Sequence, residues 1–205
     1  MSKLPHLLGI VLAGGQSRRM GTDKLFADLG GKPLVAHAVE RLKAQMEHVS
    51  IVAPPKKRND LKFKGVTFLS DHHENFQGPL AGIFAGLHNA EVHGFYGIIT
   101  VAADTPFFPD DYAHQIAAEP RHDLPGEERA TIARTSNGLH PVFGCWPIRA
   151  IDVISALLEN DTRKVMAAAD KIGWDPIDFE GAGADPFFNI NTPENLAQAQ
   201  KILQR

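Results

Sequence analysis

The stretch LGIVLAGGQSRRMGTDK, residues 8–24, decides the fold and points to the first candidate site. Its apolar first part, residues 7–13, predicts a buried β-strand. Two glycines and three cations follow closely: Gly14, Gly15, Arg18, Arg19 and Lys24. Glycine allows close approach of the backbone, successive backbone N–H groups can bind an anion, and arginine and lysine bind phosphate. We therefore predict a nucleotide-phosphate loop here, rather than an ordinary turn with solvated arginines.

Two common phosphate loops are excluded by their spacing. The dinucleotide fingerprint needs a second glycine where Gln16 stands, and the P-loop needs a Gly-Lys-Ser/Thr ending that does not follow. The segment LAGGQSRRMGTDK instead resembles the N-terminal signature of the molybdenum cofactor guanylyltransferases, nucleotidyltransferases with a Rossmann-like fold. The resemblance implies that this loop wraps the triphosphate of a nucleotide. It also implies a set of nucleotide-binding residues: Leu12, Ala13, Gly14, Gly15, Lys24 and Asp104. Asp71 joins this set because it follows a predicted strand, where α/β proteins collect ligands.

Size and composition limit the class of protein. The chain has 205 residues, 43% hydrophobic and 22% charged, which suits one globular domain. A net charge of −3 argues against a nucleic-acid protein built on a basic face. Cys145 is a single cysteine flanked by apolar residues, so we expect an inert thiol and no internal disulfide. No segment is apolar enough for a membrane span or a convincing signal peptide, so we expect a cytoplasmic protein.

Strands and helices are expected to alternate along the chain. Strands are predicted at 7–13, 48–53, 66–69, 95–103, 130–134, 139–146 and 175–179. Helices are predicted from Pro33 to about 45, from 78 onward, at 109–118, 149–160 and 163–171, and from Pro193 to the end. This alternation predicts an α/β fold, a single Rossmann-like three-layer domain over residues 1–205 with a mainly parallel central sheet. The resemblance implies a GTP-binding N-terminal part and a molybdopterin-binding C-terminal part.

Acidic residues follow two of the predicted strands. Asp104 ends the most apolar strand and Asp71 follows the strand at 66–69, positions where α/β proteins collect ligands. Asp104 could serve only as a turn residue before Thr105-Pro106. With a phosphate loop upstream, we expect it to bind Mg²⁺, which prefers carboxylate and phosphate oxygens. The Asp-Thr-Pro resemblance implies the same role.

Other segments carry further resemblances. The GPLAG run beginning at Gly78 resembles the family, and a ligand or a packed strand would explain Gly82 in a helix. Asn189 and Asn191 share one face of an extended segment, where they suit either ligand recognition or, for Asn191, helix capping. The molybdopterin-binding residues implied by the resemblance are Arg19, Gly78, Gly82, Asn189 and Asn191. The basic run at 56–64 reads as a solvated face or as a rim that attracts anions.

The resemblance implies a reaction as well as a fold. GMP would pass from GTP to the terminal phosphate of molybdopterin, with release of pyrophosphate. Arg18 and Lys24 would hold the departing phosphates, and Asp104 would bind the metal; these are the expected catalytic residues. In the resembled group Leu-Ala-Gly-Gly goes with guanine and Leu-Ala-Ala-Gly with cytosine, so residues 12–15 favour GTP. Val52 stands where family members often have asparagine, which leaves the contacts to base or ribose open.

Three alternatives stay open at this point: a CTP-using molybdopterin cytidylyltransferase, a sugar-phosphate nucleotidyltransferase and a non-enzymatic protein that delivers the cofactor. Under the main interpretation the partners are GTP, molybdopterin, molybdenum-insertion proteins, and apo-molybdoenzymes or their chaperones. No nucleic acid or membrane partner is expected.

Overall fold

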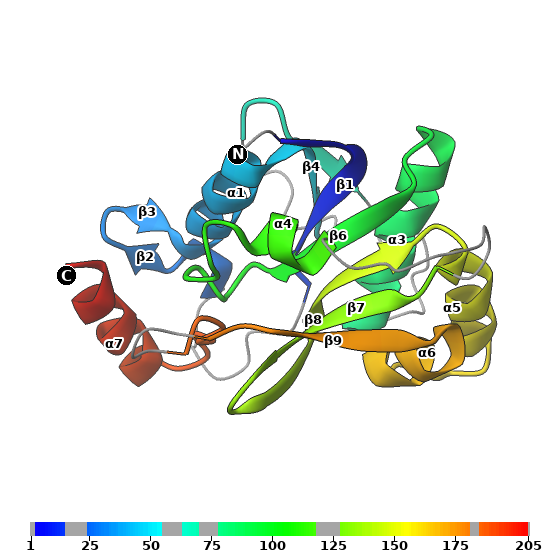
Figure 1. Cartoon of the computed structure of the whole chain (residues 1–205). Helices are drawn as coiled ribbons and strands as arrows, with labels where there is room; N and C mark the ends of the chain where they lie inside the picture. Colours follow the sequence, from blue (N-terminus) through cyan, green and yellow to red (C-terminus); the bar gives the residue numbers. More distant parts are fainter. Residues whose placement is uncertain are drawn as a thin grey trace.

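A seven-stranded sheet forms the centre of the computed structural model, which describes residues 3–14, 24–54, 63–69, 78–117, 128–180 and 185–204 (Figure 1). The strand order is β5-β4-β1-β6-β8-β7-β9. The strands are β1 (Leu4–Leu12), β4 (Met46–Val52), β5 (Thr67–Leu69), β6 (Gly97–Ala102), β7 (Ala130–Thr135), β8 (Gly138–Pro147) and β9 (Trp174–Asp178).

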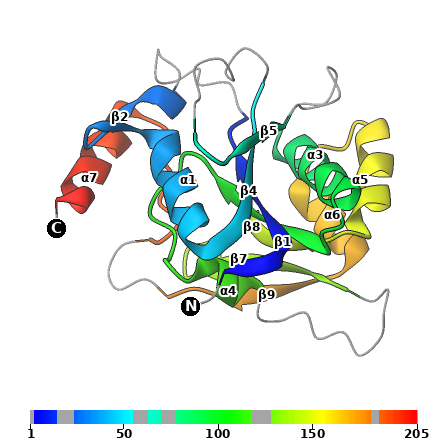
Figure 2. The same ribbon diagram turned by 90° about the horizontal axis from the view of Figure 1, so that it is seen from above.

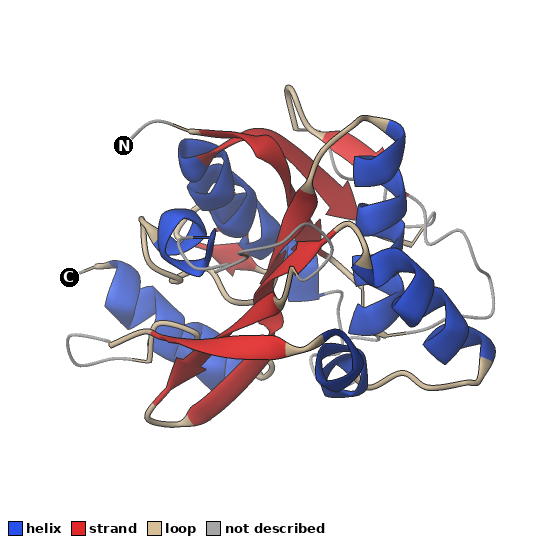
Figure 3. Cartoon of the chain, turned by 45° about the vertical axis from the view of Figure 1, so that its right-hand side comes forward, coloured by secondary structure: helices blue, strands red, loops and turns tan. Residues whose placement is uncertain are grey.

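The first four strands of the chain within this sheet run parallel, with β1 between β4 and β6. Strand β8 runs antiparallel to both β6 and β7, and β9 returns parallel to β7. The tight turn between β7 and β8 explains this reversal, because Gly138 adopts φ 119°, a left-handed conformation that favours glycine. The prediction of a mainly parallel α/β sheet is confirmed, and Figure 3 shows its continuous twist.

Helices cover both faces of the sheet, which gives the predicted three layers (Figure 2). Helices α1 (Leu34–Gln45) and α4 (Tyr112–Ala117) pack on one face, and α3 (Pro79–Val92), α5 (Ala150–Glu159) and α6 (Val165–Ile172) on the other. In β1, Ile10 and Leu12 enter one core and Val11 enters the other, together with Ala13 just after the strand. A strand buried on both faces reads as a continuous apolar run, as residues 7–13 do.

A small layer lies beside the main sheet, and only its helix α7 was predicted. It contains a 3₁₀ turn (Lys24–Phe26), a two-stranded ribbon of β2 (Asp28–Leu29) and β3 (Lys32–Pro33), and helix α7 (Pro193–Leu203). Leu29, Leu34, Ile190 and Ala199 form its own buried cluster. Pro33 was expected as the first helical residue, but it has ψ 142° and lies just before α1, because it pairs with Asp28 in the ribbon.

Among the described residues, no helix combines the length and the apolar character that a bilayer crossing requires. The other predicted elements appear close to their expected bounds. Thr192 caps α7, as predicted, and its hydroxyl accepts the N–H of Asn195.

Candidate functional site

The carboxyl ends of β1, β4 and β6 meet at one edge of the sheet. The N–H of Ala13 donates to the Val52 carbonyl at 2.9 Å, and the N–H of Ala103 donates to the Leu12 carbonyl at 3.1 Å. A cavity of about 210 Å³ opens where these strands end. Its lining comes from β1, β4, β6, β8, the start of α3 and the segment before α7: Leu12, Gly14, Val52, Gly78, Pro79, Gly82, Ala102, Asp104, Val142 and Asn189.

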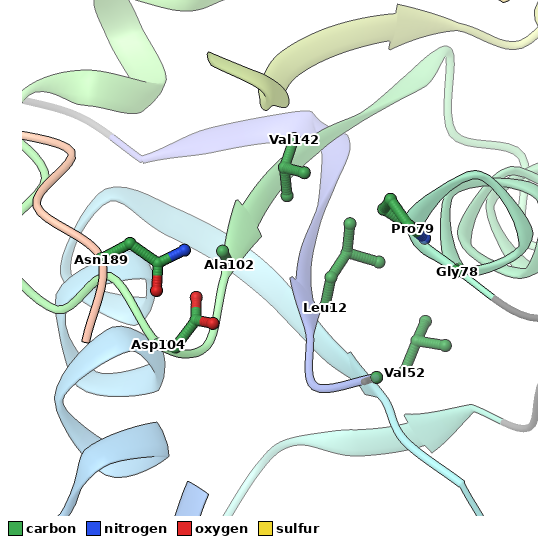
Figure 4. Close-up of a pocket in the computed structure, with 10 residues that line it drawn as sticks. Leu12, Val52, Gly78, Pro79, Ala102, Asp104, Val142 and Asn189 are labelled. Atoms are coloured by element: carbon green, nitrogen blue, oxygen red, sulfur yellow. The ribbon is translucent and has the colours of Figure 1, made fainter. Parts of the chain in front are cut away.

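The cavity has a polar side and an apolar side. Asp104 and Asn189 lie together at one side, with the Asn189 amide turned towards the carboxylate (Figure 4). Leu12, Val52 and Pro79 lie across from them. Small-molecule sites commonly have this composition, because apolar walls bind rings while a few polar groups set the orientation.

Lys24 lies beside the polar side and joins two segments that are distant in sequence. Its Nζ forms an ion pair with Asp104 Oδ2 and donates a hydrogen bond of 2.7 Å to Asn191 Oδ1. The side chains of Lys24 and Asp104 are each 15% exposed, so the charges are partly shielded from water yet reachable from the cleft. Lys24 and Asp104, which were predicted as site residues from two separate segments, are therefore in contact.

Helix α7 holds Asn191 in place. Asn195 Oδ1 accepts the backbone N–H groups of both Asn191 and Thr192, each at 3.2 Å. The backbone N–H of Ile190 donates to the Asp104 carbonyl at 2.9 Å. The segment before α7 is thus tied to the loop that carries Asp104, and the Asn191 side chain contacts Lys24 while Thr192 caps α7.

Two glycines lie at the start of helix α3 beside the cavity. An added Cβ on Gly82 would lie 2.6 Å from Leu12 Cδ2, so this glycine permits the close packing of α3 on β1. Gly78 has φ 108°, which a side chain would disfavour, and its Cβ position is open. Both glycines also line the cavity, so packing and ligand access coincide here.

His140 and Cys145 lie on β8 and have little role in the cavity. His140 Nε2 is 2.9 Å from the Thr135 hydroxyl, and its ring packs on Phe187 with centroids 4.6 Å apart. Partial burial lowers the pKa of His140, although Asp185 opposes the shift. Burial raises the pKa of Cys145 to about 12, as expected for an inert thiol.

The structure therefore brings most of the predicted site residues together. One cavity is lined by six of them: Leu12, Gly14, Gly78, Gly82, Asp104 and Asn189. Lys24 contacts Asp104, Asn191 contacts Lys24, and Ala13 is buried next to Leu12 and Gly14. The predictions for Gly15, Arg18, Arg19 and Asp71, and most of the basic run at 56–64, fall outside the described residues.

Sequence reasoning missed three residues that line the cavity, Pro79, Ala102 and Val142, and it missed Asn195, which holds the backbone of Asn191. Pro79 carried a signal, because it belongs to the GPLAG run. Asn195 carried a weaker one, since it stands three residues after the capping Thr192, where a capping box places a side-chain acceptor. Val142 carried none, because an irregularity in strand pairing brings it to the cavity.

No group of three or more His, Cys, Asp or Glu side chains among the described residues could hold a metal ion. Lys24 Nζ contacts the Asp104 carboxylate and the Asn191 amide oxygen, and both oxygens are possible ligands of a metal ion. Mg²⁺ takes one or two protein oxygens and fills its remaining positions with water and substrate phosphates. The donor set is therefore suited to magnesium and unsuited to a closed zinc site.

Comparison with known proteins agrees with this geometry. Residues 9–172 match the MobA-like NTP transferase domain family. Molybdenum cofactor guanylyltransferase from Cereibacter sphaeroides is 38% identical over 98% of each chain. The protein of the same name from Mesorhizobium japonicum is 39% identical over 97% of this chain and 96% of its own.

Solved structures share the fold. Molybdopterin-guanine dinucleotide biosynthesis protein A from Archaeoglobus fulgidus superposes with a TM-score of 0.79 at 23% identity, covering 97% of this chain and 99% of its own. A 4-diphosphocytidyl-2C-methyl-D-erythritol synthase from Anaerococcus prevotii gives 0.73 at 12% identity, over 98% and 99% of the two chains. Because proteins with different names share this fold, the sequence relatives decide the family. The chain belongs to the molybdenum cofactor guanylyltransferase family, within the MobA-like nucleotidyltransferases.

Proposed function

We propose that this enzyme transfers GMP from GTP to the terminal phosphate of molybdopterin and releases pyrophosphate. Family membership supports the reaction class. The observation that carries the proposal is the meeting of Lys24, Asp104 and Asn191 at the polar side of one cavity. A cation, a carboxylate and an amide at the end of the phosphate loop suit phosphate chemistry, and among the described residues no Ser, Thr, Cys or His lines the cavity.

Asp104 and Asn191 would hold Mg²⁺ through their side-chain oxygens. When bound, the ion would supply charge neutralisation at the α-phosphate and a template for the reacting groups. The ammonium group of Lys24 would hold the departing phosphates and stabilise the negative charge that develops on them. Arg18 is proposed to assist in this, as the sequence predicts.

The acceptor phosphate needs no general base. The second pKa of a phosphate monoester is about 6, so the group is mostly dianionic at neutral pH. The principal barrier is the approach of one anion to another. The protein lowers this barrier by placing positive charge and hydrogen-bond donors around the phosphates before the reaction begins.

The two substrates are proposed to contact two different sets of residues. Leu12, Ala13, Gly14, Gly15 and Asp71 would contact GTP together with Lys24 and Asp104. The molybdopterin contacts would come from Arg19, Gly78, Gly82, Asn189 and Asn191. Support comes from the cavity, which is lined by three residues of each set: Leu12, Gly14 and Asp104, and Gly78, Gly82 and Asn189.

Guanine is the proposed base, on the Leu-Ala-Gly-Gly sequence and on the names of the relatives. Val52 presents methyl groups to the cavity, so any hydrogen bond that reads the base must come from another group. Selective thermal stabilisation by CTP instead of GTP would favour the cytidylyltransferase alternative. Exchange with molybdenum-insertion proteins and apo-molybdoenzymes, in the cytoplasm, stays a prediction.

The test measures pyrophosphate release from GTP, Mg²⁺ and molybdopterin under anaerobic conditions. Asp104→Asn and Lys24→Met should each lower kcat by about 10²–10³-fold, the usual effect of removing one charge-stabilising group. Lys32→Met is the matched control, because Lys32 forms an exposed ion pair with Glu40 between the ribbon and α1 and lies outside the cavity lining. Near-normal turnover in both site variants, with the fold intact, would refute the proposal.

A further inference from the structure

Strand β8 contains an irregularity next to the cavity. Gly144 pairs with Ile132 of β7, whereas the next β7 residue, Ala133, pairs with His140. Residues 141–143 of β8 therefore bulge out of the pairing with β7. Pro141 suits such a position because it has no N–H to donate to a ladder. Bulges near active sites commonly redirect one side chain, which raises the question of which side chain is redirected here.

A buried hydroxyl holds the bulge from the neighbouring strand. Thr100 of β6 is 0% exposed, and its Oγ1 donates a hydrogen bond of 2.7 Å to the Val142 carbonyl. The Gly144 carbonyl oxygen lies 3.3 Å from the same hydroxyl. A buried carbonyl released from a β-ladder needs a substitute donor, and Thr100 provides it.

Two side chains of the bulge, Phe143 and Val142, have different surroundings. Phe143 is anchored in an aromatic cluster, with ring centroids 4.6 Å from Phe187 and 5.7 Å from Tyr112. Val142 lines the cavity instead, near Leu12 and Ala102 (Figure 4). The anchored ring and the Thr100 hydrogen bond thus determine where the Val142 methyl groups lie.

We propose that Val142 is a specificity-determining residue for the acceptor, as an apolar wall for the pterin ring system, and that Thr100 positions it through the bulge. The inference rests on the proposed function. Figure 4 shows Val142 between Asn189 and Pro79, away from Val52 on β4. Asn189 and the start of α3 are the proposed molybdopterin contacts, and the methyl groups of Val142 lie between them. A planar ring bound between Asn189 and α3 therefore contacts Val142.

The first test separates the two substrates. Val142→Ala should raise KM for molybdopterin about tenfold, the usual cost of lost methyl groups in a binding pocket, and leave KM for GTP within about twofold. Calorimetric titration of the GTP-free protein with molybdopterin should show the same loss of affinity. Val92→Ala is the matched control, because Val92 is 68% exposed at the end of α3. A rise in KM for GTP instead, or no change in either value, would overturn the proposal.

The second test addresses Thr100. Thr100→Val keeps the shape but leaves the Val142 carbonyl without its donor, so KM for molybdopterin should rise about threefold or more. Thr100→Ser keeps the hydroxyl and should restore the wild-type value. Tyr112→Phe serves as the control for general destabilisation, because the Tyr112 hydroxyl donates to the Thr100 carbonyl at 2.9 Å on the same strand. Equal losses for both substrates in Thr100→Val and Tyr112→Phe would show a merely structural role.

The outcomes also separate this inference from the proposed function. A wild-type protein that releases no pyrophosphate with GTP and molybdopterin would refute the proposed function itself. A wild-type protein that is active while Val142→Ala binds molybdopterin normally would refute only the role of Val142. If Thr100→Val does not fold, the Val142→Ala comparison still decides the proposal.

Discussion

Asn195 offers a sharp perturbation, because one side-chain oxygen serves both helix α7 and the site. In Asn195→Ala, the N–H groups of Asn191 and Thr192 lose an acceptor at 3.2 Å, while the Thr192 hydroxyl keeps the N–H of residue 195. Half of a capping box is therefore lost. Loss of a helix cap costs about 1 kcal/mol, with a range of roughly 0.5–2 kcal/mol. For a chain of this size that corresponds to a fall in Tm of about 2–4 °C.

The effect on activity should exceed the effect on stability. Once the backbone of Asn191 is released, its amide no longer holds Lys24 beside Asp104, and the charged groups lose their alignment. We expect kcat to fall by about tenfold or more, since small misplacements at a reacting centre are costly. Scanning calorimetry and the pyrophosphate assay measure the two effects on the same preparation.

Two variants control this experiment. Asn195→Asp keeps an acceptor oxygen and adds a negative charge at a helix N-terminus, which is favourable, so Tm and kcat should stay near wild type. Ala199→Gly weakens α7 by about 1 kcal/mol without touching Asn191. If Ala199→Gly lowers kcat as much as Asn195→Ala does, helix stability alone explains the loss and the reasoning is wrong.

Three further predictions concern the core. Gly86→Ala should lower Tm by a few degrees in calorimetry, because its Cβ would lie 2.9 Å from Ile10 Cγ1, and overpacking costs about 1–3 kcal/mol against roughly 1 kcal/mol of helix propensity gained. Cys145 should react with iodoacetamide at pH 8 only after unfolding, because its pKa in the folded protein is raised to about 12. The thiol of the unfolded chain has a pKa of about 8.5, so the contribution of Cys145 to the free energy of unfolding is full below about pH 8.5 and declines as the pH rises above it. Denaturant titrations should show this decline in wild type and not in Cys145→Ala. Gln45→Leu should destabilise the protein by about 1–3 kcal/mol in urea titrations, because the Ala113 N–H and the Pro109 carbonyl would lose buried partners at 2.7 and 3.0 Å.

Much of the fold followed from local patterns. Residues 7–13 and 95–103 predicted strands buried on both faces, and the structure places β1 and β6 side by side at the centre of the sheet. Local signals failed for the ribbon of β2 and β3, whose strands have two residues each and carry no periodicity. They also failed for the strand order, because the antiparallel insertion of β8 between β6 and β7 depends on contacts between distant segments.

The sequence by itself determined the chemistry of the site: a glycine-rich loop that ends in Lys24, a carboxylate at Asp104 and two amides at Asn189 and Asn191. These are properties of short segments, so residue type and spacing suffice to reveal them. Only the tertiary structure decided that Lys24 joins Asp104 to Asn191 and that the bulge of β8 brings Val142 to the cavity. Such contacts join residues far apart along the chain, and they depend on how strands pair and helices pack, which local sequence patterns do not encode.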